Sequence, residues 1–179
     1  MTEEMSPLDR VVATEDIRRL AYRYSDALDR RDIDALAALY RPDARFGEHG
    51  EGADAARAFF DESLREIGIA VVLVANHLIE FEDADNATGT VWAHGFIDDH
   101  DEGFIQQLIK YDDRYVRIGG EWRFTRRKHL LWLGWKHDDP APLAQAPADW
   151  PERQVGLGSM PYSEASWHAF WSTDGSATD

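Results

Sequence analysis

Asp29 is a carboxylate that a predicted helix places beside its apolar face. Residues 14–30 carry apolar side chains at helical spacing, and these form one stripe (Ile17, Leu20, Ala21, Tyr24 and Leu28). Asp29 belongs to a second stripe with Ser25, which lies about a quarter turn around the helix at roughly 100° per residue. At that angle a carboxylate either faces an internal cavity or is a solvated group near a helix end.

His77 is a second residue whose type and position suit proton transfer. It lies in a predicted strand at residues 69–82, where side chains alternate between two faces. If the charged Glu80 and Glu82 face water, His77 faces inward, unless a bulge intervenes. The same alternation places more residues on the inner face: Val71, Leu73, Ala75, Ile79 and Phe81. An inward imidazole is either a hydrogen-bonded core group or an acid–base group.

The strand predicted at residues 87–98 has one bulky face. Trp92, His94 and Phe96 alternate with smaller side chains, so these three residues share a face. Such a face either lines a pocket or forms an interface between subunits. The alternation alone is compatible with both.

The last predicted strand, at residues 122–135, combines an arginine with a histidine. Arg127 and His129 share a face with Leu131 and Leu133. An arginine at such a position is usually a solvated or ion-paired group at the rim of a sheet. It is also a group that can stabilise developing negative charge during a reaction.

Helices followed by a sheet are needed to position these residues. The sequence predicts helices at residues 14–30, 33–40 and 54–67, with short breaks between them. Four strands then follow at hairpin spacing, at residues 69–82, 87–98, 104–118 and 122–135. This order predicts an α+β architecture, in which a curved antiparallel or mixed sheet wraps around the N-terminal helices.

Composition and charge exclude several classes of function. The 179 residues most simply form one domain, and 44% hydrophobic residues suffice for a core. A formal charge of −15 argues against binding nucleic acid or an anionic membrane surface, because both require clustered lysine and arginine. Cysteine is absent, and no stretch is apolar enough for a membrane span or a secretory signal, so we expect a cytoplasmic protein.

The sequence contains no motif for a metal or a cofactor. His100 and His137 have acidic neighbours, but neither has the paired-histidine spacing of a catalytic zinc site. A glycine-rich phosphate loop and a nucleophile elbow are also absent. We therefore expect no metal and no cofactor, and chemistry that side chains carry out alone.

Residues 137–179 differ in character from the rest of the chain. They contain five prolines and several large rings (Trp150, Tyr162, Trp167, Phe170 and Trp171), and disordered tails rarely hold so many rings. We expect this aromatic, proline-rich extension to lie on the domain or on a neighbouring subunit, with a short helix near residues 163–171. The catalytic domain is predicted at residues 14–136, after a flexible lead-in at residues 1–13.

The order of the elements and two stretches of sequence resemble a known superfamily. A helix and a break containing RRDIDALAALYRPDARF are followed by a helix and four strands, with GGEWRF at the start of the last. Over about residues 14–135 the chain resembles the SnoaL-like branch of the nuclear transport factor 2-like superfamily, in the part that holds scytalone dehydratase, bile-acid 7α-dehydratase and hexachlorocyclohexane dehydrochlorinase. The resemblance implies a cone-shaped fold, which carries lyases, isomerases, hydrolases and non-catalytic subunits.

The resemblance implies roles for three of the candidate residues. The family's Tyr-x-x-x-x-Asp, near the end of the first helix, falls on Tyr24 and Asp29. In the family this aspartate hydrogen-bonds and orients a catalytic histidine. The family's arginine falls on Arg127, five residues after Trp122.

The position of the family's histidine is occupied by another residue type. Val72 or Leu73 stands there in this sequence. Either His77 takes the role at a shifted depth, or His94 or His129 does, or the usual histidine–aspartate dyad is absent.

Residues and resemblance together predict a cofactor-independent lyase acting on a small cyclic or aromatic compound. His77 would remove a proton beside an activating group, while Asp29 would orient it and support its charged form. Tyr24 or Arg127 would stabilise negative charge or assist the departure of water, halide or a small aldehyde. The candidates for substrate binding are Tyr40, Phe46, Trp92, His94, His129 and Trp132.

Other functions are compatible with the same residues. If the histidine is displaced, Asp29 itself could be the base, which favours an isomerase or a hydrolase relative. Small subunits of ring-hydroxylating dioxygenases share this fold, so the alternative from another class is a non-catalytic scaffold or binding subunit. Relatives assemble as trimers or dimers, and we therefore expect a homo-oligomer, with a trimer favoured, and a small-molecule substrate.

Overall fold

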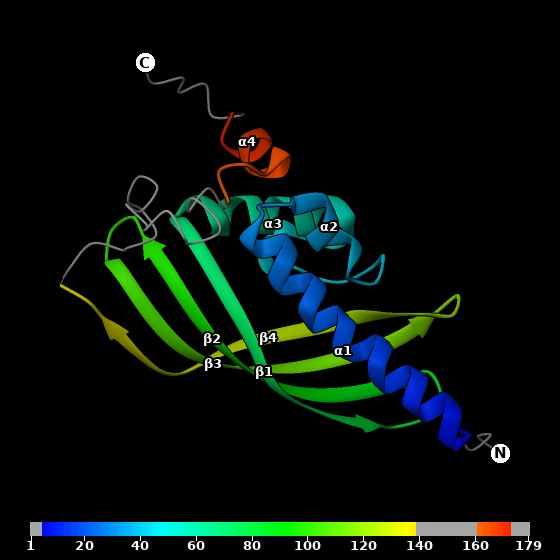
Figure 1. Ribbon diagram of the computed structural model, residues 1–179. Helices are drawn as coiled ribbons and strands as arrows, with labels where there is room; N and C mark the ends of the chain where they lie inside the picture. The colour runs from blue at the N-terminus through cyan, green and yellow to red at the C-terminus, as the bar shows by residue number, and fades with distance from the viewer. Residues whose placement is uncertain (1–4, 139–160, 173–179) are drawn as a thin grey trace.

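Three helices precede a four-stranded sheet and a fourth follows it in the computed structural model, which describes residues 5–138 and 161–172 (Figure 1). The helices are α1 (Pro7–Asp29), α2 (Ile33–Ala38), α3 (Ala53–Arg65) and α4 (Ala165–Ser172), with a 3₁₀ turn η1 (Gly47–His49). The strands are β1 (Ile67–Phe81), β2 (Asn86–Asp99), β3 (Gly103–Ile118) and β4 (Glu121–Lys136). The predicted α+β architecture is confirmed, and the strand bounds agree with the sequence pattern to within two residues.

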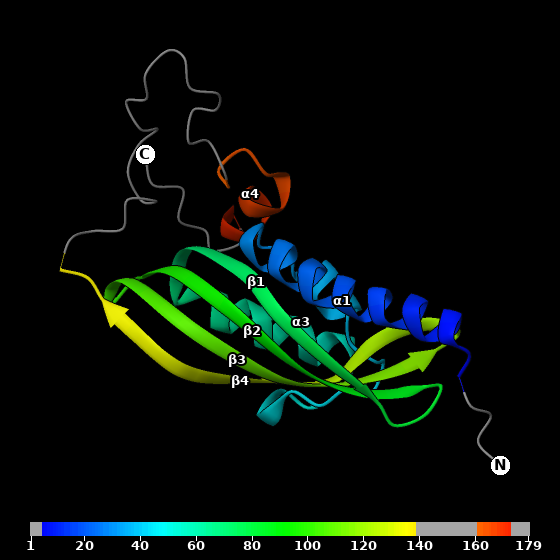
Figure 2. The same ribbon diagram turned by 60° about the horizontal axis from the view of Figure 1, so that its bottom comes forward.

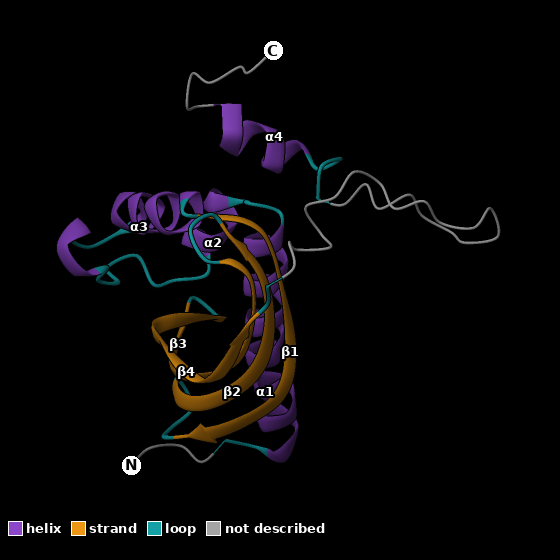
Figure 3. Ribbon diagram, turned by 90° about the vertical axis from the view of Figure 1, so that its left-hand side faces the viewer, coloured by secondary structure: helices purple, strands orange, loops and turns teal. Residues whose placement is uncertain are grey.

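The sheet is a curved antiparallel meander in the order β1-β2-β3-β4. Helix α1 contacts both edge strands, β1 and β4, and therefore spans the open side of the curve (Figures 2 and 3). Helices α2 and α3 lie against each other at one end of the sheet (Figures 1 and 3). The sheet and helices thus form the predicted cone with an inner face and an outer face.

Helix α1 begins earlier than the sequence pattern predicted. Ser6 is its N-cap and accepts a hydrogen bond from the backbone N–H of Asp9 (3.2 Å), with Pro7 in the first turn. Thr14, where the sequence predicted the helix to begin, instead donates to the backbone carbonyl of Arg10 (2.7 Å) inside the helix. The prediction of a flexible lead-in up to residue 13 is therefore wrong for the described residues from Pro7 onward.

A bulge in β1 reverses part of the predicted inner face. Val74 pairs with Ala93 and His77 with Val91, so Ala75 and Asn76 together oppose one residue of β2. His77, Ile79 and Phe81 face inward as predicted. Upstream of the bulge Val72 faces inward and is 7% exposed, whereas Leu73 is 53% exposed. The inward placement of Val71, Leu73 and Ala75 was wrong because the extra residue shifts the alternation.

Aromatic rings fill the inside of the cone. Phe124 is fully buried, and its ring lies within 6.2 Å of those of Tyr24, Tyr40 and Tyr115. Tyr40 also contacts Phe46 (5.0 Å between ring centroids), and Phe60 of α3 adds to the same cluster. The interior near α3 is therefore a packed core, held together by edge-to-face and tilted ring pairs.

The short helix expected near residues 163–171 is present as α4. Its Trp167 and Phe170 are buried, so this part of the C-terminal extension lies on the domain. Residues 139–160, with Trp150, lie outside the described residues, as do residues 173–179. None of the described helices is both long and apolar enough to cross a membrane.

The outer face of the sheet carries an exposed apolar surface. Trp92 and Trp132 contact each other there, with ring centroids 4.8 Å apart. Trp132 is 63% exposed. The pairing of the strands places Leu73 and Trp135 on the same outer face, and both are about half exposed. We call Leu73, Trp92, Trp132 and Trp135 the outer patch.

Candidate active site

The end of α1 is joined to β1 by two polar side chains. Asp29 accepts a hydrogen bond from the backbone N–H of Val72 (3.2 Å), and Ser25 donates to the carbonyl of the same residue. Both side chains lie one helical turn apart on the stripe identified in the sequence. The angle of this stripe turns Asp29 toward the sheet, and its carboxylate is half-buried.

Burial raises the pKa of Asp29 to about 7. The N–H of Val72 and the positive charge of Arg31 lower it, while the negative charge of Asp26 raises it further. Burial also raises the pKa of Tyr111, to which the charge of Asp29 contributes, so the two residues are electrostatic neighbours across the interior. Asp29 is thus a carboxyl group that exchanges its proton near neutral pH.

No histidine among the described residues is hydrogen-bonded to Asp29. His77 lies further along β1, beyond the bulge, and its Nε2 is 2.9 Å from the hydroxyl of Tyr115. Tyr115 in turn donates to Asp113 (2.8 Å), which pairs with Arg127 through two bonds of 2.9 and 2.6 Å. The structure therefore links His77 through the hydrogen bonds of Tyr115 and Asp113 to Arg127. It does not link His77 to Asp29.

The hydrogen bonds of this chain fix the protonation of His77. The hydroxyl proton of Tyr115 goes to Asp113, so Nε2 of His77 must donate to the hydroxyl oxygen. Burial lowers the pKa of His77 to about 4, with Asp113 acting in the opposite direction. The imidazole is neutral at pH 7, and its buried Nδ1 has no partner in the described part of the chain.

Arg127 lies in the centre of the cone as a buried cation. Its side chain is 3% exposed and that of Asp113 is fully buried. The guanidinium carbon lies 4.5 Å from the ring of Tyr24, 4.3 Å from that of Tyr111 and 4.5 Å from that of Phe124. Burial lowers the pKa of Arg127, but the ion pair with Asp113 outweighs burial and raises it, so the group stays charged.

Three buried tyrosines interact with this cation. Tyr24, Tyr40 and Tyr111 have raised pKa values, chiefly because of burial, and stay protonated at neutral pH. None of their hydroxyls makes a hydrogen bond within residues 5–138 and 161–172. Their hydroxyl protons are therefore not used in any hydrogen bond between described residues.

The predicted substrate-binding residues divide between the two faces of the sheet. Tyr40 and Phe46 lie inside. His129 is on the inner face beside Tyr111 (ring centroids 5.5 Å apart) but is exposed, and partial burial of its imidazole lowers its pKa. Trp92, His94 and Trp132 lie outside. They do not line the interior, because Val91 and Ala93 are the residues of β2 that face the core.

Asp113, Tyr115 and Arg31 were not among the predicted site residues. Asp113 lies between Tyr111 and Tyr115 on the inner face of β3. An acidic residue between two inward aromatic residues was therefore the signal in the sequence that could have identified it. Arg31 has the only non-glycine positive φ of the described residues (58°), which sequence alternation does not indicate.

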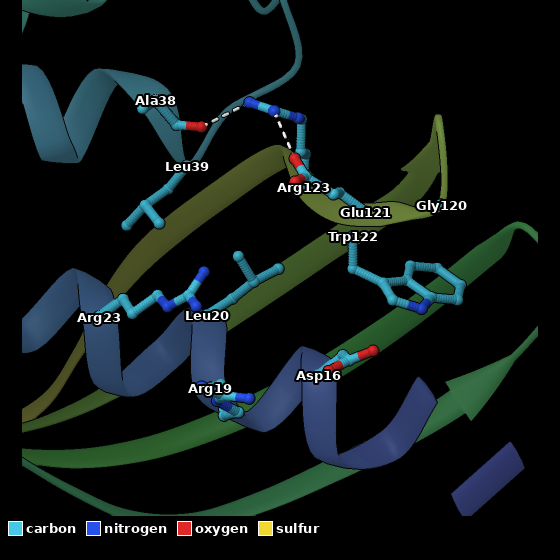
Figure 4. A pocket seen from close by; sticks show the side chains of 10 residues that line it. All are labelled: Asp16, Arg19, Leu20, Arg23, Ala38, Leu39, Gly120, Glu121, Trp122 and Arg123. Carbon is cyan, nitrogen blue, oxygen red and sulfur yellow. Dashed lines mark hydrogen bonds and ion pairs between the residues drawn. The ribbon is translucent and has the colours of Figure 1, made fainter. Parts of the chain in front are cut away.

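A hollow of about 210 Å³ lies elsewhere, between α1 and the start of β4 (Figure 4). Arg19, Arg23 and Arg123 line it, together with the indole of Trp122. Arg123 is held by the backbone carbonyl of Ala38 (2.7 Å) and by a carboxylate of β4. None of the predicted catalytic residues lines this hollow, so we place the candidate site in the cone.

The chain matches a known protein family. A family model for the SnoaL-like domain matches residues 9–128, about two thirds of the chain. The chain belongs to the SnoaL-like family. This family is part of the nuclear transport factor 2-like superfamily, so the resemblance seen in the sequence is confirmed. A search of curated proteins gave no match.

Solved structures show the same fold at low sequence identity. A putative scytalone dehydratase from Novosphingobium aromaticivorans is 22% identical, with a TM-score of 0.65 over 79% of this chain and 99% of that one. A hexachlorocyclohexane dehydrochlorinase from Novosphingobium barchaimii is 21% identical, with a TM-score of 0.68 over 74% and 95%. A protein of unknown function from Mycobacterium tuberculosis is 21% identical, with a TM-score of 0.60 over 94% and 90%. These likenesses establish the SnoaL-like fold and no activity.

Removing Asp113 should destabilise this SnoaL-like protein strongly. Asp113→Asn leaves the guanidinium of Arg127 buried without a counter-ion, and we expect a loss of about 3–5 kcal/mol in the free energy of unfolding. Urea denaturation at pH 7 measures it. The control is Glu121→Gln, which breaks an exposed pair with Arg123 (2.8 Å) and should cost less than about 1 kcal/mol. Equal losses in the two variants would contradict the central role of the buried pair.

The pKa of Asp29 should make stability depend on pH. Its carboxyl titrates near 3.8 in the unfolded chain and near 7 in the folded one. Between these values the native state binds the additional proton, so the free energy of unfolding falls as the pH rises. Asp29→Asn removes this dependence. From pH 5 to pH 8 the free energy of unfolding of the variant should therefore rise by on the order of 2 kcal/mol relative to that of wild type. Denaturation at several pH values tests this, and a difference that does not change with pH contradicts it.

Proposed function

We propose that this protein is a cofactor-independent lyase acting on a small cyclic or aromatic compound, with Asp29 as the base. The observation that carries the proposal is the half-buried carboxylate whose pKa burial raises to about 7. A base is most effective when its pKa lies near the working pH, because it is then ionised yet still binds a proton well. His77, with its pKa lowered to about 4, is a weaker base at the same pH.

The interior offers donors for the charge that forms when a proton is removed. The hydroxyls of Tyr24, Tyr40 and Tyr111 are neutral and unpartnered among the described residues, and Arg127 supplies positive charge beside them. Hydrogen-bond donors that are already aimed at a developing anion lower the barrier without reorganisation. These residues therefore suit the stabilisation of an enolate-like or carbanionic intermediate.

The elimination itself needs two groups. Asp29 takes the proton, the electron pair of the broken C–H bond forms a double bond, and the leaving group departs with its own bonding pair. Where the leaving group is hydroxide, a tyrosine hydroxyl such as that of Tyr24 can supply the proton that turns it into water. A halide would need no proton.

An isomerase is the second candidate. It is favoured by one observation: Asp29 has no histidine partner in the described residues, so the carboxylate has to act by itself. The first step would be the same, but Asp29 would return the proton to another carbon instead of a group being expelled. The two candidates differ in their products, since only a lyase releases water, halide or a second carbon fragment.

Asp29→Asn should abolish turnover, because the amide cannot accept the proton. The assay offers cyclic compounds with a hydroxyl or halide one carbon away from an acidic C–H and follows the new double bond by ultraviolet absorbance. We expect a loss of about 10²–10⁴-fold, and a wild-type kcat/KM that rises with pH to a plateau above about 7. Asp26→Asn, a change in an exposed carboxylate on the same helix, is the control and should keep the activity. Activity retained in Asp29→Asn would refute the proposed base. A wild-type protein that turns over none of these compounds but binds partner proteins would instead be a scaffold.

We also propose that the outer patch joins copies of this chain into a homo-oligomer, with a trimer favoured. Exposed tryptophans gathered on one face are unusual for a monomer. Sedimentation velocity at micromolar concentration should give the mass of the oligomer for wild type and the mass of a monomer for Trp132→Glu. Val11→Glu, an exposed apolar residue on α1, is the control and should sediment as wild type does. A monomeric wild-type protein would contradict the proposal.

A further inference from the structure

Arg31 is an unusual residue directly beyond the end of α1. It is 1% exposed and has a left-handed backbone conformation (φ 58°). Its guanidinium donates to the backbone carbonyls of Leu28 (2.7 Å), Ile67 (3.3 Å) and Gly68. A side chain that must reach three carbonyls on two elements holds the end of α1 against the start of β1.

The charge of Arg31 has no ion-pair partner within the described ranges. Its Nε is buried and makes no hydrogen bond to any described residue. Buried cations are normally paired, since removing an unpaired charge from water is costly. The opposite charge of Asp29, two residues earlier in the chain, acts on it, and this attraction acts on both groups.

Helix α4 covers this cation. The guanidinium of Arg31 lies 5.1 Å from the ring of Trp167, which is itself buried. Ser166 donates to the carbonyl of Arg30 (2.8 Å), and Phe170 lies under the guanidinium of Arg65 at 4.5 Å. Helix α4 is therefore docked on the turn that follows Asp29, at the helical end of the cone (Figures 1 and 2).

We propose that Arg31 is a positioning residue for the carboxylate of Asp29, and that α4 is part of the acid–base site because Trp167 keeps Arg31 in place. The charge of Arg31 favours the ionised form of Asp29, while its three bonds to carbonyls fix the distance between the two groups. The indole of Trp167 excludes water from the guanidinium, so that water does not screen the attraction. The interpretation of the pair as catalytic rests on the proposed function, but the coupling itself does not.

Two other titratable groups interact electrostatically with Asp29, and they come from two elements. Asp26, on α1, opposes the ionisation of Asp29, and the charge of Asp29 raises the pKa of the neutral Tyr111 on β3. Neither changes in the variants below. A shift in the titration of Asp29 therefore reports on Arg31.

The test is the titration of the Asp29 side-chain carboxyl carbon by NMR in the full chain, which needs no substrate. Arg31→Gln removes the charge and should raise the pKa of Asp29 by about one unit or more, since an opposite charge at short range typically lowers a carboxyl pKa by one to three units. Arg31→Lys keeps the charge and should shift the pKa by less than half as much. Arg30→Gln, a change in the half-buried neighbour that pairs with Asp26, is the control and should leave the titration within a few tenths of a unit.

Two results would overturn the role of Arg31. One is a shift in Arg31→Gln no larger than that in Arg30→Gln. The other is an equal shift in Arg31→Lys and Arg31→Gln, which would mean that packing rather than charge is responsible. If Arg31→Gln does not fold, the comparison of Arg31→Lys with Trp167→Leu decides, because Trp167→Leu keeps apolar bulk and should raise the pKa more than Arg31→Lys does.

The part played by α4 has its own measurement. The backbone N–H of Val72 donates its hydrogen bond to Asp29. Trp167→Ala should speed hydrogen exchange at this amide by tenfold or more, relative to exchange at the amide of Tyr115 in the middle of the sheet. His168→Ala, on the exposed side of α4, is the matched control and should leave this ratio unchanged. An unchanged ratio in Trp167→Ala would show that α4 is only appended to the domain. Loss of activity in Asp29→Asn is a separate result, so the two proposals can fail independently.

Discussion

The buried ion pair between Arg127 and Asp113 is the interaction on which the interior depends. Two charges removed from water are tolerated only when each is fully bonded, and here two bonds join them while Tyr115 donates a third to Asp113. The rings of Tyr24, Tyr111 and Phe124 then surround the guanidinium with negative π faces. Because the cation is satisfied by this set, the tyrosine hydroxyls are not used in holding it. The same arrangement that stabilises the core leaves the hydroxyls of Tyr24, Tyr40 and Tyr111 without hydrogen-bond partners among the described residues.

The two inner carboxylates occupy opposite environments. Asp113 is fully bonded by an arginine and a tyrosine, whereas Asp29 has one backbone N–H and the nearby charge of Arg31 against its burial. A carboxylate whose hydrogen-bond sites are filled stabilises the fold, whereas a desolvated carboxylate with few partners can exchange its proton. The position of Asp29 at the end of a helix is what makes this possible, since the turn that follows it also carries Arg31.

The sequence predicted the elements well and the contacts within the site less well. Strands were found because alternation runs through the whole of each. The angle of the stripe left Asp29 between an internal cavity and solvent, and alternation grouped Arg127 with His129 without deciding that its guanidinium is buried. The helix start at Pro7 was missed because Thr14 is also a plausible cap, and only the structure shows its hydroxyl bonded within the helix. The bulge at Ala75 and Asn76 leaves no mark on the pattern, yet it decides that Val72 rather than Leu73 faces Asp29. Partners such as Asp113 for Arg127 are set by cross-strand register, which a single sequence specifies only weakly.

Replacing the family's histidine with an apolar residue does not by itself remove acid–base chemistry from this fold. In a histidine–aspartate dyad the aspartate supports the charge of an imidazole, so its own pKa must stay low. At this position the chain has Val72 or Leu73, and the side chain that faces inward, Val72, adds apolar surface while its backbone gives Asp29 one N–H. Losing the imidazole removes a cation that would have stabilised the carboxylate, and adding apolar surface removes water; both raise the pKa of Asp29 toward neutrality. If the family's histidine is absent, as the resemblance implies, the apolar residue in its place raises the pKa of Asp29 and so supports the proposed role of this carboxylate as the base.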